Sequence, residues 1–459
     1  MLGQTKRIHF VGIGGIGMSG IAELLVNLGY EVSGSDAKRS EITDRLARLG
    51  VTVQVGHAAH QVGAADVVVT SSAIAPDNPE VAAARVRGIP VIPRAEMLAE
   101  LMRLQRGIAV AGAHGKTTTT SMIALVLERA GMDPTAVIGG RLSAFGSNAK
   151  LGRGAYIVAE ADESDRSFLR LSPSIAVITN LDREHMETYG TFEEIQRAFA
   201  EFANNVPFDG LVVACADDRA LAAILPAISR PLVTYALNTD ADMTASDAVL
   251  SPFASVSRVW LRRGGSREAL GDLTLSVPGR HNILNALAAV AVGLEVKVPF
   301  DRIASALAEF HGAERRFQKL GEARGVLVVD DYGHHPTEIA AVIAAARTLR
   351  RRIVAVFQPH RYSRTQQLMA EFGPAFAGAE EVVLTDIYSA GEPPIPDVTI
   401  DALASAMRRG ASARLHVVPA LEELPARVAA LARDGDVVLT LGAGSIGTVG
   451  PRILQELER

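Results

Sequence analysis

The stretch Ile-Ala-Val-Ala-Gly-Ala-His-Gly-Lys-Thr-Thr-Thr-Thr, residues 108–120, decides how the rest of the chain is organised. Its four apolar residues predict a short buried strand, and the apolar-rich run 121–130 predicts the helix after the loop. A glycine loop between a strand and a helix directs backbone N–H groups at phosphate oxygens, while Lys116 adds a point charge and the Thr117 hydroxyl can reach Mg²⁺. We therefore expect a nucleotide triphosphate on this loop. Its candidate contacts are Gly112, Ala113, His114, Gly115, Lys116, Thr117 and Thr118.

The composition is that of a globular protein with several domains. The 459 residues carry a net charge of −5, with 48% hydrophobic and 21% charged residues, and at about 150 residues per domain the length predicts three domains. Mild acidity argues against a nucleic-acid partner. The single cysteine, Cys215, excludes an intrachain disulfide and indicates a reducing compartment. Because no apolar run reaches the roughly 18 residues that span a bilayer, we expect a cytoplasmic protein without membrane insertion.

A second glycine loop lies near the beginning of the chain. Glycines at positions 12, 14 and 17 follow the predicted strand 8–11 in Gly-x-Gly-x-x-Gly spacing, and Asp36 ends the next strand about twenty residues later. This pattern is typical of an NAD-binding Rossmann domain. The segment ends near residue 107, however, and leaves no room for a dehydrogenase half before the next phosphate loop, so a diphosphate sugar nucleotide is the alternative ligand. Its candidate contacts are Gly14, Gly15, Ile16, Gly17, Asp36, His57, Ser71 and Ser72.

Two polar residues that follow buried strands are candidates for metal binding beside the phosphate loop. Glu160 ends the predicted strand 156–160, and a carboxylate at the carboxyl end of a strand beside a phosphate loop is a typical Mg²⁺ ligand. His185 lies on the loop after the strand 174–179 and is a candidate for a second cation or a phosphate contact. The alternative reading of a lone histidine is an ordinary surface residue.

The pattern changes after residue 233. Short alternating segments between 233 and 277 predict an antiparallel insertion with a hairpin. His281, Asn282 and Asn285 then open a helix with a spacing that places Asn285 one turn beyond His281. Amide groups in this position are candidates for recognition of an adenine or ribose edge, although helix capping alone would explain Asn282.

The last third reads as a further α/β sheet. Polar clusters follow four predicted strands, at 330–338, 358–365, 386–392 and 442–447, and the carboxyl ends of parallel strands are where such sheets bind ligands. Arg361 and Arg364 stand three residues apart beside a histidine. Because guanidinium groups pair bidentately with carboxylates, this pair is a candidate carboxylate clamp.

These motifs, in this order, resemble the Mur ligase family of peptidoglycan synthesis, and more closely its alanine-adding branch. The resemblance covers nearly the whole chain, and it rests on five segments. They are His-Phe-Val-Gly-Ile-Gly-Gly-Ile-Gly-Met (9–18), Gly-Ala-His-Gly-Lys-Thr-Thr-Thr-Thr (112–120), Ala-Glu-Ala-Asp-Glu-Ser-Asp (159–165), Asp-Asp-Tyr-Gly-His-His-Pro-Thr-Glu (330–338) and Phe-Gln-Pro-His-Arg-Tyr (357–362). The phosphate loop is shorter than the common form, with Val110 where a glycine is usual, and this spacing is the family's own variant.

The resemblance implies an α/β fold of three domains: a Rossmann-like UDP-substrate domain (1–107), a phosphate-loop ATPase domain with the antiparallel insertion (108–312) and a Rossmann-like amino-acid domain (313–459). It implies ATP, Mg²⁺, UDP-N-acetylmuramate and L-alanine as ligands, and a monomer or weak homodimer. By similarity, Lys116, Thr117, Glu160, His185, Asn282, Asn285, Arg316 and Asp331 match ATP, metal or catalytic positions, with Lys116, Glu160, His185, Arg316 and Asp331 as the catalytic set and Thr117, Glu160 and His185 as metal ligands. Tyr332, His334, Arg361 and Arg364 match positions around the incoming L-alanine.

Three alternative functions remain open at this stage. A sister muropeptide ligase would add a different amino acid or peptide with the same ATP machinery. An NAD-dependent oxidoreductase would bind nicotinamide on the first glycine loop. A non-catalytic nucleotide-binding protein would more plausibly have lost Lys116, Glu160 or His185, and all three are present.

Overall fold

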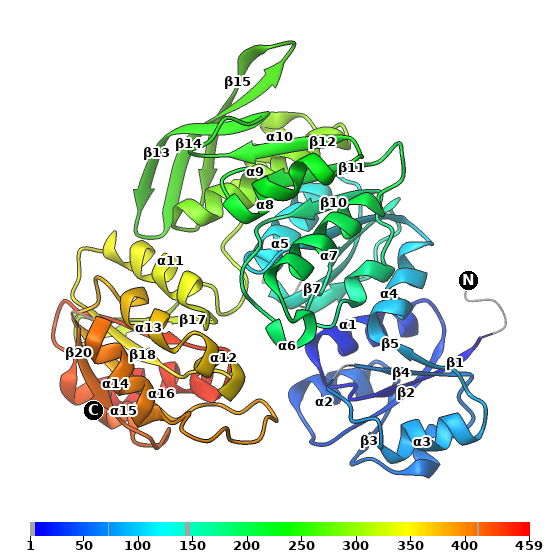
Figure 1. Cartoon of the computed structure of the whole chain (residues 1–459), viewed down its shortest axis with the longest axis horizontal. Coiled ribbons are helices and arrows are strands. Elements are labelled where there is room, and N and C mark those ends of the chain that lie inside the picture. Colours follow the sequence, from blue (N-terminus) through cyan, green and yellow to red (C-terminus); the bar gives the residue numbers. More distant parts are fainter. Residues whose placement is uncertain (1–4, 72, 143–146, 411–412) are drawn as a thin grey trace. The chain divides into compact units, whose positions relative to one another are not determined.

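The computed structural model describes residues 5–71, 73–142, 147–410 and 413–459 of the chain (Figure 1). Within these residues the backbone forms three sheets of five, ten and six strands. The chain divides into two compact units. Unit 1 comprises Met1–Ser246, Arg258–Leu273 and Leu284–Phe310, and unit 2 comprises Asp247–Ser257, Thr274–Ile283 and His311–Arg459.

The first sheet is wholly parallel, with the strand order β3-β2-β1-β4-β5. Its strands are β1 (Arg7–Val11), β2 (Glu31–Asp36), β3 (Thr52–Val55), β4 (Val67–Thr70) and β5 (Val91–Pro93), and its helices are α1 (Ile16–Asn27), α2 (Glu41–Arg48), α3 (Pro79–Val86) and α4 (Arg94–Met102). The order reverses at β1, between β2 and β4. Parallel α/β sheets bind ligands at such a switch point, and the first glycine loop leaves the sheet there.

The second sheet is mixed and has the order β15-β14-β13-β12-β11-β10-β6-β9-β7-β8. Its strands are β6 (Arg106–Ala111), β7 (Thr135–Leu142), β8 (Ser147–Lys150), β9 (Tyr156–Glu160), β10 (Ile175–Ile178), β11 (Leu211–Cys215), β12 (Leu232–Ala236), β13 (Met243–Ser251), β14 (Ala254–Arg263) and β15 (Ser266–Leu275). Its helices are α5 (Lys116–Arg129), α6 (Met186–Tyr189), α7 (Phe192–Asn204), α8 (Arg219–Ile224), α9 (Arg280–Glu295) and α10 (Phe300–Ala308). β6 lies between β10 and β9 and pairs with both in parallel, so three strands end beside the phosphate loop. Consecutive strands β13, β14 and β15 form the predicted insertion.

The third sheet has the order β16-β17-β21-β18-β19-β20, with β16 antiparallel at one edge. Its strands are β16 (Gln318–Ala323), β17 (Val326–Asp331), β18 (Ile353–Phe357), β19 (Glu381–Leu384), β20 (Arg414–Val417) and β21 (Val437–Leu441). Its helices are α11 (Pro336–Arg347), α12 (Tyr362–Gln367), α13 (Met369–Ala375), α14 (Ile400–Gly410), α15 (Leu424–Leu431) and α16 (Val449–Glu458).

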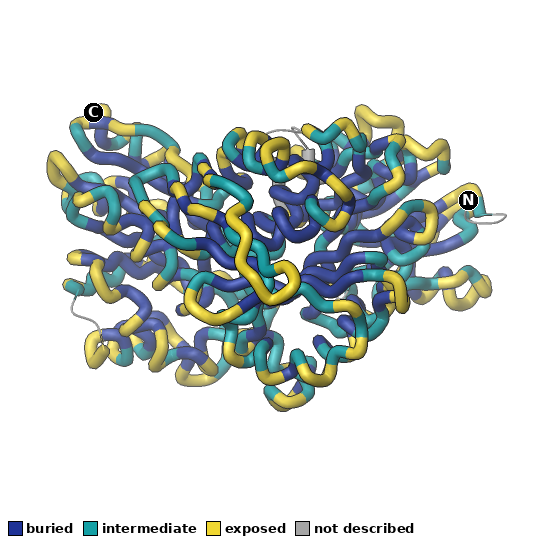
Figure 2. Tube along the Cα trace, turned by 90° about the horizontal axis from the view of Figure 1, so that it is seen from above, coloured by how far each residue is buried: buried dark blue, intermediate teal, exposed yellow. Residues whose placement is uncertain are grey.

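The third sheet is buried on both faces because its strands are apolar at successive positions. Ile353, Ala355 and Phe357 of β18 pack into one hydrophobic cluster with α11, α13 and α14. Val354 and Val356 of the same strand pack into the opposite cluster with α15 and α16. Side chains alternate across a strand, so a continuous apolar run needs helices on both faces. Figure 2 shows the resulting pattern, with buried backbone in dark blue and exposed loops in yellow.

The predicted fold class is confirmed: the chain is α/β, with two mainly parallel sheets and a mixed middle sheet. The structure also corrects one detail, because α5 begins at Lys116 and not near residue 121. Threonine has a low helix propensity, but Thr119 N donates to Gly115 O, so the helix begins within the threonine run. Within the described residues, no helix is both long and apolar enough to cross a membrane.

Candidate active site

The phosphate loop connects β6 to α5, and its two glycines have conformations that side chains would not tolerate. Gly112 has a φ of 136°, and a Cβ atom there would lie 2.0 Å from Thr179 Oγ1. Gly115 has a φ of 81°, and a Cβ atom would lie 2.7 Å from Asn285 Oδ1. The loop therefore follows the neighbouring strand end closely, and Asn180 accepts hydrogen bonds from Ala113 N and His114 N. Asn285 of α9 therefore lies at this loop.

Lys116 is the first residue of α5, and its ammonium group is enclosed by the loop and one carboxylate. Nζ donates to Gly112 O at 2.5 Å, to Ala113 O at 3.2 Å and to Glu163 Oε1 at 2.8 Å. Burial alone would lower the pKa of Lys116, but the negative charge of Glu163 outweighs burial and raises it above its usual range. Lys116 is therefore a permanent cation at the phosphate loop.

Glu163 belongs to a compact group of possible metal ligands with Glu184 and His185. One ligand atom of each lies within 4.8 Å of the others, and His185 Nε2 is 3.9 Å from Glu163 Oε1 and 3.7 Å from Glu184 Oε2. Within the described chain, Glu163 Oε2 is buried without a hydrogen-bond partner, and burial raises the pKa of this carboxyl against the pull of Lys116. A buried, unsatisfied carboxylate oxygen is costly unless a cation or donor joins it, so this group fits a divalent cation.

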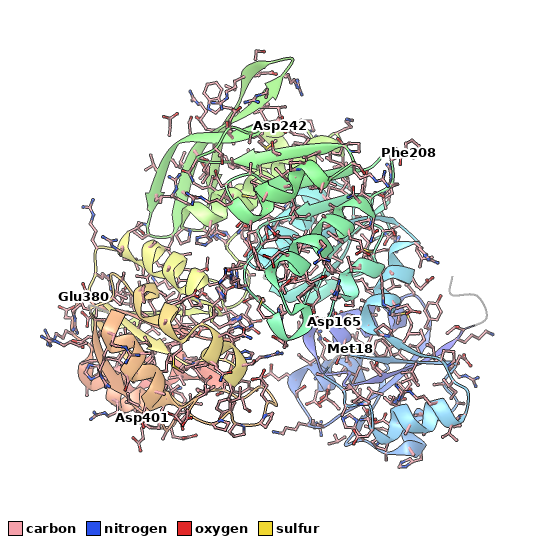
Figure 3. The ribbon with its side chains drawn as sticks, viewed as in Figure 1. Met18, Asp165, Phe208, Asp242, Glu380 and Asp401 are labelled. Carbon is pink, nitrogen blue, oxygen red and sulfur yellow. The ribbon has the colours of Figure 1, made fainter. Side chains whose placement is uncertain are left out.

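His185 has a left-handed backbone, with a φ of 57°, immediately before α6. Burial lowers the pKa of its imidazole, but Glu187, Glu163 and Glu184 together raise it above its usual value. Two hydrogen bonds fix the preceding acidic loop, because Tyr189 Oη donates to Glu163 O and Thr188 Oγ1 donates to Ser164 O. The same loop contains Asp165, labelled in Figure 3, whose Oδ1 accepts from Ser167 N.

The other predicted residues of this region lie around the same strand ends. Glu160 ends β9 and accepts a hydrogen bond from Gly139 N at 2.6 Å, and Thr117 is the second residue of α5. His114 is held on both sides of its backbone, since Asn180 Oδ1 accepts from His114 N and Thr179 Oγ1 donates to His114 O. Asn282, the third residue of α9, has a different environment, because its Nδ2 donates to Pro278 O at 2.7 Å.

The first glycine loop is tied to β2 by two of its amides and by a carboxylate. Gly12 N and Ile13 N donate to Ser35 O, and Gly14 N donates to Asp36 Oδ2 at 2.8 Å. Asp36 therefore shapes the loop directly. Gly15 and Ile16 continue into α1, where Ile16 is 44% exposed. The predicted contact Ser71 follows β4, and the predicted contact Ser72 lies outside the described residues.

His57 is held by a buried hydrogen-bond network under this loop. Its Nδ1 lies 2.8 Å from Glu80 Oε1, and His9 Nε2 lies 2.6 Å from the other oxygen of Glu80. Ser35 Oγ donates to Glu80 Oε1 at 2.7 Å. Burial would raise the pKa of Glu80, but these hydrogen bonds outweigh it and lower the pKa. An ionised Glu80 accepts from Nδ1 of His57 and so orients its ring.

Asp331, the last residue of β17, lies near Arg316, which precedes β16. Asp331 Oδ2 accepts from Phe317 N and Oδ1 accepts from Gly333 N, and Arg316 Nη1 lies 3.4 Å from Glu338 Oε1. Burial raises the pKa of Asp331 to about 6, although Arg316 and both amides oppose the shift. Burial and the charge of Arg316 lower the pKa of nearby His281 to about 4, so its imidazole is neutral at pH 7.

The raised pKa of Asp331 predicts a pH-dependent stability. A carboxyl whose pKa is raised on folding stabilises the folded state below its unfolded value of 3.8 and loses that contribution as the pH rises through about 6. At about 1.4 kcal/mol per pKa unit, the loss approaches about 3 kcal/mol. Asp331→Asn removes the titration and should therefore gain stability relative to the parent between pH 4 and pH 7.

Urea unfolding followed by circular dichroism at pH 4.5, 5.5 and 7.0 measures this difference. Asp209→Asn, at an exposed position, is the matched control and should follow the parent protein at every pH. A constant difference between Asp331→Asn and the parent across the series would show that burial does not perturb Asp331.

The predicted amino-acid residues form one ring-and-guanidinium cluster in unit 2. Tyr332 and His334 pack edge to face with ring centroids 5.6 Å apart, and His334 lies 5.5 Å from His360. Arg364 Nη1 is 3.1 Å from His360 Nδ1, and Arg361 follows His360 directly. Tyr332, His334 and Arg364 are thus linked through His360, whereas the Arg361 guanidinium group faces Glu392.

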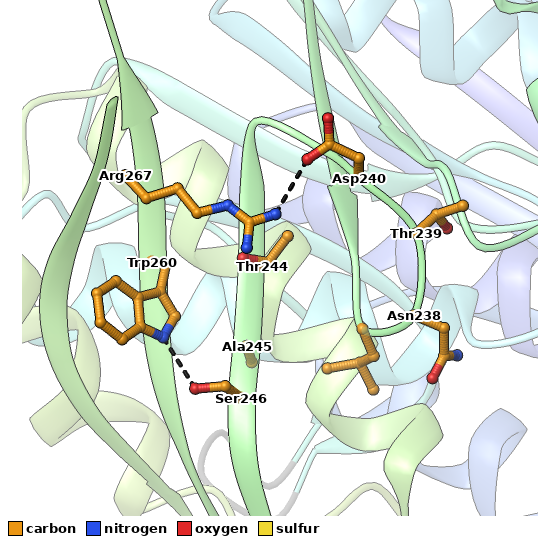
Figure 4. Close-up of a pocket in the computed structure, with 9 residues that line it drawn as sticks. Asn238, Thr239, Asp240, Thr244, Ala245, Ser246, Trp260 and Arg267 are labelled. Atoms are coloured by element: carbon orange, nitrogen blue, oxygen red, sulfur yellow. Dashed lines mark hydrogen bonds and ion pairs between the residues drawn. The ribbon is translucent and has the colours of Figure 1, made fainter. Parts of the chain in front are cut away.

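A cavity of about 460 Å³ lies apart from all of these residues, on the insertion of the middle sheet (Figure 4). Trp260 Nε1 donates to Ser246 Oγ on one side of it, and Arg267 pairs with Asp240 on the other. None of the predicted site residues lines this cavity.

Sequence reasoning missed three residues that the geometry places at the site. Glu163 and Glu184 complete the possible cation group, and Arg94 pairs with Asp162 at 2.7 Å beside Gly17. The sequence of the acidic run 162–165 does not indicate that Glu163 is buried while the neighbouring carboxylates are more exposed. Arg94 did carry a signal, since it follows β5 at the carboxyl end of the parallel sheet, where ligand-binding residues gather.

The fold and the site together define a class of protein: a nucleotide-dependent α/β enzyme with a phosphate loop, a carboxylate–histidine group beside it and a second glycine loop. Three family models match the chain in succession. They are described as "Mur ligase family, catalytic domain" over residues 7–106, "Mur ligase middle domain" over 110–293 and "Mur ligase, glutamate ligase domain" over 315–444.

The chain belongs to the Mur ligase family. It is 54% identical over 460 residues to the UDP-N-acetylmuramate–L-alanine ligase of Geobacter sp. (strain M21), an alignment that covers 100% of this chain and 99% of the relative. It is 53% identical over 461 residues to the ligase of the same name from Syntrophotalea carbinolica, with 100% of both chains covered. The crystal structure of UDP-N-acetylmuramate-alanine ligase from Thermotoga maritima superimposes with a TM-score of 0.83 and 31% identity over 98% of each chain.

Proposed function

We propose that the chain joins L-alanine to the lactyl carboxylate of UDP-N-acetylmuramate, with cleavage of ATP to ADP and phosphate, in peptidoglycan synthesis. The observation that carries this proposal is the full-length similarity, above 50% identity, to ligases named for that reaction. Membership of the Mur ligase family decides against the alternative of an NAD-dependent oxidoreductase. A sister ligase with a different amino acid is an outcome of the test below.

ATP is proposed to bind the phosphate loop, with its γ-phosphate near Lys116. The substrate carboxylate attacks the γ-phosphorus, ADP leaves and an acyl phosphate forms. Because Lys116 is partly buried and permanently charged, it can stabilise the negative charge on the transferring phosphoryl group. In this structure Glu163 Oε1 accepts a hydrogen bond from Lys116 Nζ, so Lys116 has to exchange at least part of that contact for phosphate oxygens.

The metal proposal uses the carboxylates and the histidine beside the loop. Thr117, Glu160 and His185 are proposed to hold Mg²⁺, and Glu163 and Glu184 are close enough to His185 to contribute. The fit rests on the unsatisfied Glu163 Oε2 and on oxygen donors of the type that Mg²⁺ prefers. When bound, Mg²⁺ would neutralise phosphate charge.

The amino-acid step is proposed for the cluster of the third sheet. Arg361 and Arg364 would bind the carboxylate of L-alanine, beside Tyr332 and His334. The amine attacks the acyl carbon, a tetrahedral intermediate forms and phosphate leaves with the oxygen that came from the substrate carboxylate. Asp331 and Arg316 support the loop that carries Tyr332, since Arg316 lies 5.4 Å from the centre of its ring.

The remaining assignments are proposals of the same kind. UDP would bind Gly14, Gly15, Ile16, Gly17, Asp36, His57, Ser71 and Ser72, and ATP would also contact Asn282 and Asn285. We propose domain bounds of 1–107, 108–312 and 313–459, a cytoplasmic location and a monomer or weak homodimer.

Phosphate release with ATP, Mg²⁺ and UDP-N-acetylmuramate tests the proposal directly. L-Alanine is compared with glycine, L-serine and D-glutamate, each over a range of concentrations. The proposal expects the highest kcat/KM with L-alanine and little release when either the sugar nucleotide or the amino acid is omitted. Preference for D-glutamate or a peptide would assign the chain to a sister ligase, and NADH binding without phosphate release would contradict ligase activity.

A further inference from the structure

Arg361 adopts a backbone conformation that is unfavourable for an arginine. Its φ is 70° and its ψ is 140°, at the turn that leads from β18 into α12. Non-glycine residues rarely occupy such conformations, and those that do are held there by their surroundings, often at functional sites. The question is therefore which contacts impose this turn on Arg361.

The segment 386–392, which we call the clasp, supplies the backbone contacts. It follows β19 and lies beside the turn, where Tyr388 N donates to Pro359 O and Arg361 N donates to Tyr388 O, both at 2.8 Å. The rings of Tyr388 and His360 stack at an angle of 16° with centroids 5.6 Å apart. The clasp thus forms hydrogen bonds to the residues on both sides of His360 and stacks on the His360 ring. It thereby fixes the residue that precedes Arg361.

Glu392, at the end of the clasp, supplies the side-chain contacts. Its two oxygens accept from Ser363 N at 3.0 Å and from Ser363 Oγ at 2.7 Å. The same carboxylate lies 3.8 Å from Arg361 Nη1. On the far side of the turn, Thr365 Oγ1 donates to Arg361 O at 2.7 Å. One carboxylate therefore fixes the residue two positions after Arg361 and also faces the guanidinium group.

We propose that Glu392 is a positioning residue for the amino-acid substrate and acts through Arg361. It holds the strained turn by way of Ser363 and directs the Arg361 guanidinium while the substrate carboxylate is absent. At 3.8 Å its pairing with Arg361 is loose, so an incoming carboxylate can take the short bidentate contact. This inference rests on the proposed function, because it deepens the role given there to Arg361.

Steady-state kinetics of the full chain tests the inference through the three separate KM values. Glu392→Gln removes the charge and one acceptor, and it is expected to raise the KM for L-alanine by roughly tenfold while kcat changes less than about threefold. The KM values for ATP and UDP-N-acetylmuramate should stay within about twofold. Ser363→Ala removes one hydrogen bond and should shift the same KM in the same direction by less. Glu371→Gln, at an exposed position of α13, is the matched control and should leave all three values unchanged.

A double-mutant cycle separates positioning from general damage. In an Arg361→Ala background, Glu392→Gln should add less than about twofold to the KM for L-alanine, because the residue through which it acts is gone. Three results would each overturn the inference. The first is an unchanged KM for L-alanine in Glu392→Gln, and the second is a similar rise in all three KM values. The third is an undiminished rise in the KM for L-alanine when Glu392→Gln is made in the Arg361→Ala background.

The outcomes also separate this inference from the proposed function. If the wild-type chain prefers another amino acid, the same KM comparison is made with that substrate, and the inference stands or falls on it. If phosphate release needs no amino acid, both are overturned. If L-alanine is the substrate and Glu392→Gln leaves the KM for L-alanine unchanged, only the inference is overturned and the proposed function stands.

Discussion

Replacing Lys116 with alanine is expected to lower kcat/KM by at least about a thousandfold. The ammonium group is the cation that the first residue of α5 places against the phosphate loop, and preorganised charges of this kind stabilise the phosphoryl transition state. The effect should fall mainly on kcat. Phosphate release under saturating substrates measures it.

Lys116→Ala is also expected to lose stability, and a double variant can separate that loss from the loss of activity. Removing Lys116 leaves Glu163 buried without its cation, and breaking a buried pair in this way costs about 3–5 kcal/mol of stability. The pair Lys116→Met with Glu163→Gln removes both charges and should fold better than Lys116→Ala while remaining inactive. Lys319→Ala, at an exposed lysine, is the control. Near-normal turnover in Lys116→Ala or in the double variant would refute the role given to Lys116 at the phosphate loop.

Glu160→Gln is the second change with a large expected effect. Glutamine retains an oxygen that can accept from Gly139 N, so the fold should be preserved, but the variant loses the negative charge proposed to hold Mg²⁺. Because a bound metal supplies several kcal/mol of charge stabilisation, kcat should fall by about 10²–10³-fold. The Mg²⁺ concentration for half-maximal activity should rise.

A titration of activity with MgCl₂ separates metal binding from folding. Glu201→Gln, at an exposed position of α7, is the control and should show the parent's Mg²⁺ dependence. If Glu160→Gln lost activity with an unchanged Mg²⁺ dependence, the carboxylate would act in some other way than as a metal ligand.

Local patterns predicted the fold because each signal occupied consecutive residues. The runs 108–111, 156–159 and 353–357 are apolar throughout, and the strands β6, β9 and β18 contain them. Glycine spacing predicted the tight turn between β6 and α5, where Gly112 and Gly115 occupy conformations that exclude a side chain. A sequence can show such requirements because they involve neighbours along the chain.

The pairing of charges across the fold could not be predicted in the same way. Glu163 is one of three carboxylates in four residues, and only the packing of α6 against its loop buries it beside Lys116. Glu80 lies 71 residues from His9, and its role as a shared acceptor appears only when α3 packs onto the first sheet. The role of Glu392 could not be predicted for the same reason, because its partner Ser363 lies 29 residues away in the sequence.

The central claim, that the substrate carboxylate is activated as an acyl phosphate, can be tested with oxygen isotopes. UDP-N-acetylmuramate labelled with ¹⁸O in both lactyl carboxylate oxygens is converted with ATP and L-alanine, and the released phosphate is analysed by mass spectrometry. Attack of the carboxylate on the γ-phosphorus leaves one of its oxygens on phosphate, so the account predicts one ¹⁸O atom in each phosphate released. Phosphate without the label, formed at the same rate as the amide product, would contradict it.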